Sequence, residues 1–290
     1  MLQYSIANHL VQVSGTGLNH LSRFTPFIST ETNGKEPILH VQMGVRLEDR
    51  NVAPLYSFPF GAIAICNLAV SEGTYLFKME RTGYRDLLME IKNQNGRFFV
   101  TTNMDENVNV DLLRFGSWIA FNIAFAHHQT IALHASTVCY EGKSALFLGE
   151  SGTGKSTHTQ LWLDHIPNTE LLNDDSPFVR IMDNHSVWVF GSPWSGKTPC
   201  YKNRHTPIAA IVRLSQSPYN KITRLKGIAA FGALLPSCPP AFAYDETLLG
   251  NITNILNVVL EQIPVYSLEC LPNPEAAHLV FNTLKESGRL

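Results

Sequence analysis

The chain has 290 residues, of which 44% are hydrophobic and 16% charged, so it can bury a large core and is long enough for two domains. Its 22 Lys and Arg against 24 Asp and Glu give a net charge of −2, and neither nucleic acid nor an anionic membrane surface is therefore an expected partner. The 5 cysteines are scattered without a CxxC pair, which favours reduced thiols over disulfides or a zinc site.

The first residues show no basic segment followed by an apolar run, so no signal peptide is expected. The most apolar runs, 58–70 and 115–126, are shorter than a membrane span and are each interrupted by an asparagine. These features predict a cytoplasmic protein.

Residues 1–110 are predicted to form a smaller, β-rich N-terminal domain. Aromatic and β-branched residues mark strands at 75–80 and 96–103, and Asn95-Gly96 between two apolar runs predicts a hairpin. The stretch 14–51 shows little periodicity and predicts no element. No chemistry is visible in this part, so its role stays open between a sensor, a substrate-recognition module and a scaffold.

Residues 111–290 are predicted to form an α/β domain. Apolar residues at helical spacing predict a largely buried helix over 107–127, with the domain boundary near its start. Strand-like and helix-like segments then alternate, which is typical of α/β domains. Strands are expected at 130–142, 143–150, 170–181, 186–194, 209–215 and 264–270, and helices at 154–165, within 227–235, within 247–261 and at 274–286.

The strongest motif is the run Gly149-Glu150-Ser151-Gly152-Thr153-Gly154-Lys155-Ser156, which fits G-x-x-x-x-G-K-[ST] at every fixed position. Glycines let backbone N–H groups turn toward phosphates, and a helix N-terminus adds partial positive charge. Lys155 can reach the β- and γ-phosphates, and the Ser156 hydroxyl can bind Mg²⁺. An apolar strand-like run precedes the motif and a helical segment follows, so nucleotide binding over 149–157, Thr157 included, is favoured over a merely glycine-rich turn.

A pair of carboxylates follows the motif. The segment 170–175 has the pattern of a short apolar strand that ends in Asp174 and Asp175. Such carboxylates can hold Mg²⁺ or accept a proton from an attacking hydroxyl. Two adjacent carboxylates repel each other, so one should titrate at higher pH unless a cation neutralises them. The alternative is a turn, because Asp-Asp-Ser-Pro is also good turn chemistry.

The segment GSPWSGK (191–197) carries a further signal. Lys197 could meet a phosphate or an acidic substrate, while Trp194 could stack on a ligand or fill the core. A Pro-Gly turn with a surface lysine is an equal alternative. Candidate phosphate contacts, each of which could equally be a solvated surface residue, are Arg204, Arg213 and Arg224.

Together, LHAS (133–136), GESGTGKST (149–157), LLNDDSP (171–177) and GSPWSGK (191–197) resemble the HPr kinase/phosphorylase and phosphoenolpyruvate carboxykinase superfamily, especially its small HPr kinase-like members. The resemblance covers about residues 117–290. It implies a carboxykinase-like P-loop domain in which a mixed β-sheet is flanked by helices. The β-rich N-terminal domain precedes that domain and shows no such resemblance.

The resemblance also implies roles for individual residues. Lys155 matches the phosphate-binding lysine, and Ser156 matches the metal-binding hydroxyl. Asp175 matches the general base of the kinases, which in the carboxykinases is a metal ligand. His134 matches a histidine near the transferred phosphoryl group; without the resemblance it would be interpreted as a core histidine, as His158 and the other nearby histidines are.

Some positions depart from the HPr kinases. Thr157 stands where they have an acidic residue, and Trp188 stands where they have a glutamate. The resemblance therefore does not extend to a second metal contact or to the phosphorylase reaction. HPr itself is not supported as a substrate, and the segments that handle oxaloacetate in the larger carboxykinases have no counterpart.

The sequence thus predicts an ATP- and Mg²⁺-dependent kinase that transfers a phosphoryl group to a hydroxyl of a protein serine or a small metabolite. Asp175 would accept the proton and contact the metal with Ser156, Asp174 would tune its neighbour, and Lys155 would hold phosphate charge. The alternative is a nucleotide-binding regulatory or scaffold module without phosphotransfer. The acceptor and the oligomeric state, a homo-oligomer included, stay open.

Overall fold

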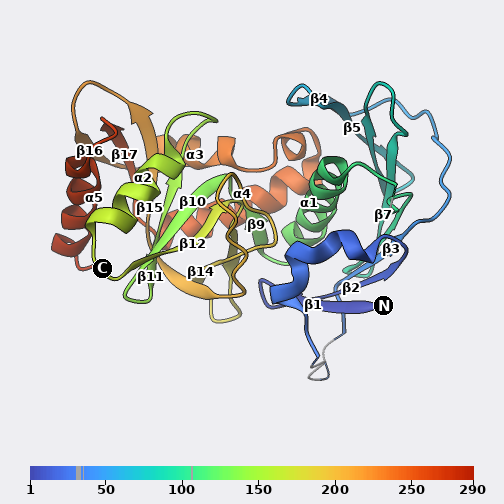
Figure 1. Cartoon of the computed structure of the whole chain (residues 1–290), viewed down its shortest axis with the longest axis horizontal. Helices are drawn as coiled ribbons and strands as arrows, with labels where there is room; N and C mark the ends of the chain where they lie inside the picture. Colours follow the sequence, from blue (N-terminus) through green and yellow to red (C-terminus); the bar gives the residue numbers. More distant parts are fainter. Residues whose placement is uncertain (31–33, 35, 106) are drawn as a thin grey trace. The chain divides into compact units, whose positions relative to one another are not determined.

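A computed structural model describes residues 1–30, 34, 36–105 and 107–290 (Figure 1). These residues divide into two compact units, each with a sheet of its own. Unit 1 comprises Met1–His128 with Ala241–Leu249, and unit 2 comprises Gln129–Pro240 with Gly250–Leu290. The boundary predicted near residue 110 lies earlier along the chain than this division, which follows His128. The helix predicted over 107–127 therefore belongs to unit 1. That the units have separate roles stays a prediction.

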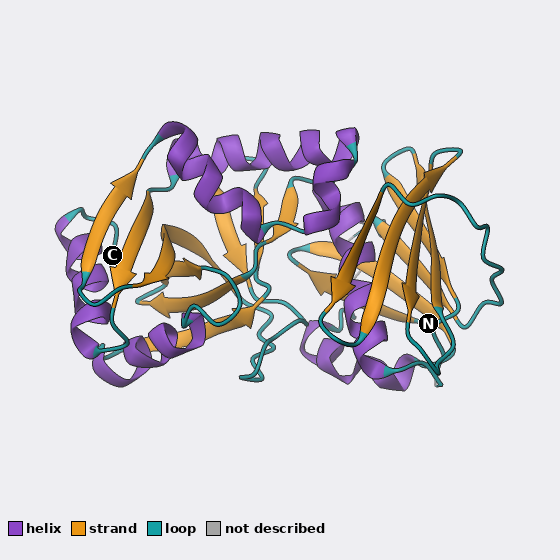
Figure 2. Ribbon diagram, turned by 90° about the horizontal axis from the view of Figure 1, so that it is seen from above, coloured by secondary structure: helices purple, strands orange, loops and turns teal. Residues whose placement is uncertain are grey.

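The strands of unit 1 form one mixed sheet (Figure 2), in which the order is β1-β2-β3-β8-β7-β6-β5-β4. Strand β3 is parallel to both of its neighbours, and the other neighbours are antiparallel. The predicted hairpin is confirmed, because Gln94 pairs with Arg97 across Asn95-Gly96. The strands are β1 (Leu2–Ile6), β2 (His9–Gly15), β3 (Leu39–Met43), β4 (Tyr56–Phe60), β5 (Ala64–Ser71), β6 (Thr74–Glu80), β7 (Leu87–Gln94) and β8 (Arg97–Thr102).

Helix α1 (Val110–Ala126) packs against β6, β7 and β8 of this sheet. Its start is capped by Asn109, whose side chain accepts a hydrogen bond of 2.9 Å from the Asp111 backbone N–H. Side chains alternate along β6, so that Tyr75, Phe77 and Met79 are buried. The predicted buried helix is confirmed, and a 3₁₀ segment, η1 (Leu18–Phe27), lies in the stretch for which the sequence predicts no element.

The strands of unit 2 form a mixed sheet in the order β12-β10-β11-β15-β14-β13-β9, with β17 beside β15 and β16 beside β17. The pairs β11–β15 and β15–β17 are parallel and the rest are antiparallel. The mixed α/β class predicted for this part is confirmed. The strands are β9 (Thr130–Ala132), β10 (Ala135–Tyr140), β11 (Lys143–Leu148), β12 (Thr169–Asp175), β13 (Phe178–Ile181), β14 (Val187–Phe190), β15 (His205–Gln216), β16 (Lys221–Leu225) and β17 (Val265–Cys270).

Helices cover both faces of the unit 2 sheet. Helices α2 and α5 pack together on one face, and α3 with the later turns of α4 lies on the other (Figures 1 and 2). Trp162 of α2 is fully buried against Phe147 of β11 in the core beneath α2 and α5. The predicted helices are confirmed as α2 (Lys155–His165), α3 (Gly227–Leu234), α4 (Glu246–Gln262) and α5 (Pro274–Glu286).

Two segments predicted as strands are each broken at the same level of the sheet. Residues 130–142 divide into β9 and β10 at Leu133 and His134, and residues 170–181 divide into β12 and β13 at Ser176-Pro177. Strand β9 pairs with β13, whereas β10 pairs with β12. Pro177 has no N–H to donate to a ladder, while its carbonyl accepts the Leu133 N–H at 3.1 Å. The continuous strand expected over 130–142 is therefore wrong, the strand end predicted at Asp175 is confirmed, and the two breaks bring His134 and the end of β12 together.

Within the part of the chain that the structure describes, no helix combines the length and the apolar character needed to cross a bilayer.

Candidate functional site

The glycine-rich motif forms the turn between a buried strand and a helix, as the sequence predicts. Strand β11 ends at Leu148, the loop occupies 149–154, and α2 begins at Lys155. Gly154, the residue before the helix, has φ 100°, a conformation that side chains disfavour. Thr153 closes the loop through its hydroxyl, which donates to the Glu150 carbonyl at 2.8 Å. The N-terminus of α2 therefore faces the loop, which is the arrangement that favours anions.

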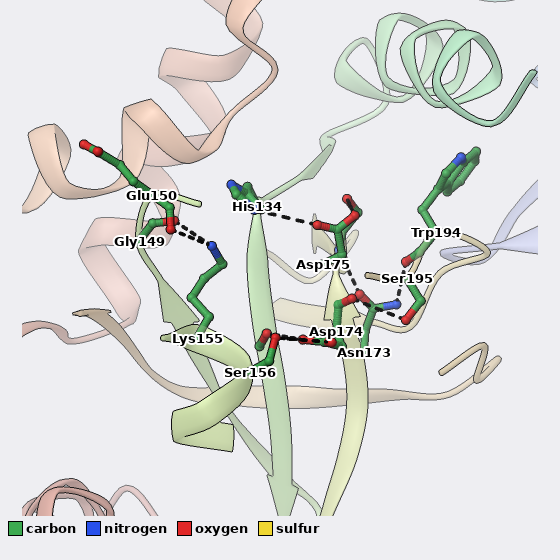
Figure 3. A network of polar contacts seen from close by, with 12 residues as sticks. His134, Gly149, Glu150, Lys155, Ser156, Asn173, Asp174, Asp175, Trp194 and Ser195 are labelled. Atoms are coloured by element: carbon green, nitrogen blue, oxygen red, sulfur yellow. Dashed lines mark hydrogen bonds and ion pairs between the residues drawn. The ribbon is translucent and has the colours of Figure 1, made fainter. Parts of the chain in front are cut away.

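The Lys155 side chain folds back over this loop. Its Nζ donates to the Gly149 carbonyl at 2.8 Å and to the Glu150 carbonyl at 3.2 Å (Figure 3). Burial lowers the pKa of Lys155, Asp175 and Asp174 oppose that effect, and Arg213 adds to it. The Lys155 ammonium is partly buried and hydrogen-bonded to two backbone carbonyls, so an anion at the loop would stabilise it further.

Asp174 is the buried member of the carboxylate pair, with 3% of its surface exposed. Its Oδ1 accepts hydrogen bonds from the Ser156 hydroxyl at 3.0 Å and from the Ser136 hydroxyl (Figure 3). Its Oδ2 accepts the Thr198 backbone N–H at 3.3 Å. These donors satisfy a carboxylate that would otherwise be costly to bury. The bond to Ser156 joins the first turn of α2 to the end of β12.

Asp175 turns away from Ser156 and toward His134. The distance from its Oδ1 to His134 Nε2 is 3.7 Å (Figure 3). Its φ of 147° is rare for a residue with a side chain, and such conformations cost about 1–3 kcal/mol and cluster at functional sites. Pairing of Asp175 with Ala135 and a bridge to Ser195 hold the backbone in place.

His134 lies half-buried between the loop and the aspartates. Burial lowers its pKa, the Lys155 charge acts in the same direction, and Asp175 and Asp174 oppose them. The imidazole is therefore neutral at neutral pH. Its backbone N–H donates to the Ser237 carbonyl at 2.7 Å, which fixes its position at the break between β9 and β10.

The segment 191–197 is hydrogen-bonded to the end of β12, next to the two aspartates. Asn173 Nδ2 donates to the Trp194 carbonyl at 3.0 Å, and the Gly196 N–H donates to the Asp174 carbonyl. A Cβ added to Gly196 would lie 2.9 Å from that carbonyl oxygen, so the close approach requires glycine. Trp194 is 2% exposed and packs edge-on against Phe178, which makes it a core residue and not a stacking platform.

The structure brings most of the predicted site residues together. The loop 149–154, Lys155, Ser156, the two aspartates and His134 meet at one edge of the sheet (Figure 3). The exposed residues among the predicted binding residues include Ser151 on that loop, Ser156 and Thr157 on the first turn of α2, and Lys197 at the end of the segment 191–197. The sequence pairs Ser156 with Asp175 for the metal, whereas the structure places Asp174 against Ser156.

Sequence reasoning missed the structural donors around Asp174. Ser136, two residues after His134 on β10, donates to Asp174 Oδ1, and the Thr198 backbone N–H donates to Oδ2, yet neither residue belongs to the glycine-rich motif. The signal that could have found Ser136 is the alternation of side chains along a strand that neighbours β12.

A Mg²⁺ site has suitable ligands here. The Ser156 hydroxyl and the Asp174 and Asp175 carboxylates are hard oxygen ligands, and Mg²⁺ commonly takes only one or two carboxylates, with water and phosphate oxygens completing its shell. No group of three or more His, Cys, Asp or Glu side chains poised to hold a metal occurs among the described residues.

Comparison with protein-family models gives no match, and no curated protein matches the chain. Among solved structures, the chain is similar to the HPr(Ser) kinase/phosphatase from Coxiella burnetii, with 12% identity over 55% of this chain and 90% of that chain. The TM-score of 0.32 describes a distant structural likeness over part of the fold.

Proposed function

We propose that unit 2 binds ATP with Mg²⁺ and transfers the terminal phosphoryl group to a hydroxyl of a protein serine or a small metabolite. The observation that carries this proposal is the bond between the Ser156 hydroxyl at the start of α2 and the Asp174 carboxylate at the end of β12, beside the glycine-rich loop. A module that only binds a nucleotide needs the loop alone. Carboxylates set against the loop are what phosphoryl transfer requires in addition.

The loop and Lys155 would hold the phosphate charge. Backbone N–H groups of 149–154 and the α2 N-terminus provide fixed dipoles, and Lys155 Nζ can exchange its carbonyl partners for phosphate oxygens. When bound, Mg²⁺ would supply further neutralisation of phosphate charge, and Ser156 with Asp174 are the residues that would hold it. Phosphoryl transfer depends mainly on such positioning and electrostatics.

Asp175 would act as the general base. The proton of the acceptor hydroxyl would pass to its carboxylate while the acceptor oxygen forms a bond to the γ-phosphorus and the bond between the γ-phosphorus and its bridging oxygen breaks. Charge that develops on the departing β-phosphate would be held by Lys155. The neutral His134 beside Asp175 would orient that carboxylate without competing for the proton at neutral pH.

The same proposal includes the carboxykinase-like relationship and the cytoplasmic location expected from the sequence. The order of motifs and the parallel pair β11–β15 within an otherwise largely antiparallel sheet support the first of these.

Lys155→Ala tests the nucleotide site directly. Because Lys155 faces the loop and packs in no core, we expect the variant to keep the fold and to lose ATP binding or turnover. Calorimetric titration with Mg·ATP, followed by transfer from γ-labelled ATP to protein and metabolite fractions with mass spectrometry of the products, measures both. Lys221→Ala, an exposed lysine of β16, is the matched control.

Wild-type protein should also melt at a higher temperature with Mg·ATP, by mass action. No change in melting temperature at saturating ATP over all Mg²⁺ concentrations would contradict the nucleotide site. ATP binding without transfer to any acceptor or to water would instead favour the regulatory module.

A further inference from the structure

Arg213 lies at the edge of the sheet where the glycine-rich loop begins. In the parallel pair β11–β15, Arg213 is the register partner of Leu148, the residue directly before the loop. The carboxyl ends of neighbouring parallel strands meet at one edge, and ligands of α/β sheets bind there. Gln216, further along β15, donates to the Gly152 carbonyl at 3.3 Å, so this end of β15 follows the loop closely.

The guanidinium of Arg213 is held by one contact to α3 and one to the glycine-rich loop. Nη1 donates to the Ala233 carbonyl at 3.2 Å, and Nη2 lies 3.8 Å from Glu150 Oε1. The Arg213 side chain is 27% exposed and that of Glu150 is 84% exposed. Arg213 is also close enough for its charge to act on Lys155. Two cations, Arg213 and Lys155, therefore lie at the same loop, and the exposed Glu150 carboxylate is close to Arg213.

The other candidate arginines are engaged elsewhere. Arg204 Nη1 lies 2.6 Å from Glu170 Oε1, and the Arg224 guanidinium carbon stacks 5.4 Å from the centre of the Tyr266 ring. The ambiguity that the sequence leaves among these residues is thus resolved by their partners, and Arg213 is the one aimed at the loop.

We infer that Arg213 is a second phosphate-binding residue, which exchanges Glu150 for the β- or γ-phosphate oxygens of a nucleotide, and that Glu150 is the internal anion displaced. This inference rests on the proposed function. An ion pair with so exposed a carboxylate contributes little in water, whereas a polyphosphate offers more charge and bidentate acceptors for a guanidinium. The ligand class is a nucleotide with phosphates beyond the first.

Arg213→Gln and Glu150→Gln test this inference because they should act in opposite directions. We expect Arg213→Gln to weaken ATP binding about 10- to 100-fold and to change AMP binding little. Glu150→Gln removes the competing anion and should tighten ATP binding about 2- to 5-fold. Arg224→Gln, which removes a stacked arginine away from the loop, is the control. Calorimetric titrations with Mg·ATP and with AMP provide the affinities.

Several outcomes overturn the inference. Unchanged ATP affinity in Arg213→Gln, with Lys155→Ala still impaired, overturns the role of Arg213 and leaves the proposed function standing. Equal losses for ATP and AMP would show that Arg213 only supports α3 through Ala233, and would overturn it too. Glu150→Gln keeps that contact, so if Arg213→Gln fails to fold, unchanged ATP affinity in Glu150→Gln overturns the inference. A wild type that binds no ATP overturns both.

Discussion

Adjacent aspartates in this protein occupy opposite environments. Asp174 is buried under two serine hydroxyls and a backbone N–H, while Asp175 faces the open side of the site and the neutral imidazole of His134. Asp174 already accepts several hydrogen bonds, whereas the Asp175 side chain is 33% exposed and so is better placed to meet the hydroxyl of an acceptor. Substitution of Asp175 should therefore affect phosphoryl transfer, whereas substitution of Asp174 should affect Mg·ATP binding.

Asp175→Asn keeps the shape of the side chain and removes its charge and proton affinity. We expect transfer to slow by about 10²- to 10⁴-fold while ATP affinity stays near that of the wild type. Asp174→Asn should instead weaken Mg·ATP binding, because the amide nitrogen cannot accept from Ser156 or Thr198. Titration with Mg·ATP paired with single-turnover rates separates the effects. Near-wild-type rates in both variants would remove the mechanism.

At this scale the sequence reveals which residues carry chemistry but not how they pair. The sequence shows a short apolar strand that ends in two carboxylates, and it shows the lysine and serine that follow the glycine-rich loop. Which aspartate meets Ser156 depends on the face that each side chain takes along β12, and that face is set by pairing with β10. The same limit left Arg213 undistinguished from Arg204 and Arg224, because its place beside Leu148 is a register between strands far apart in sequence.

Helix α2 connects the site to the core through a buried histidine. His158 is 3% exposed, and its Nε2 accepts the Trp162 indole N–H at 3.3 Å, four residues along the helix. Its ring also lies 4.6 Å from that of Phe147. The structural role expected from the sequence is confirmed. Protonation would break the acceptor bond and place a charge in the core beneath the loop.

Burial lowers the pKa of His158 to about 4 from an ordinary value of 6.5. Between these values the unfolded chain binds more protons than the folded one, so stability falls as the pH drops from 6.5 toward 4, by up to about 3 kcal/mol. Urea unfolding at pH 7 and pH 5 should show about 2 kcal/mol of this loss in wild type and a clearly smaller one in His158→Gln, where His134 still contributes. His165→Gln, at the exposed end of α2, should keep the wild-type slope. Identical pH dependence in all three proteins would contradict the assignment to His158.

The elements that the sequence predicted well are those specified by residues close together in the chain. The capped amphipathic helix α1, the Asn-Gly hairpin and the strand–loop–helix of the motif are each specified by neighbouring residues. The break at His134 was missed because an apolar run looks the same whether it pairs with one partner throughout or changes partner midway, whereas the end of β12 at Asp175 was visible in its paired carboxylates.

For the molecule as a whole, the sequence places a β-rich part before an α/β part, and the division into compact units follows the same order. Membership of α1 in unit 1 was beyond local reasoning, since its apolar face could have covered either sheet. The assignment of residues 241–249 to unit 1 could not be predicted from the sequence either, because only contacts between distant parts of the chain define it. The order of strands within each sheet could not be predicted for the same reason, since it depends on pairing between strands far apart in sequence.

Each unit has a sheet and a buried core of its own, so each should open independently of the other. A nucleotide bound to the loop of unit 2 should then stabilise unit 2 alone, by about 2.7 kcal/mol at a ligand concentration 100 times the Kd. Hydrogen exchange with and without Mg·ATP should show slower exchange in β11, α2 and β12, and unchanged exchange in β6 and β7. Lys155→Ala should abolish the difference. Equal slowing in both units would show that they open together, and no slowing in unit 2 would contradict the nucleotide site itself.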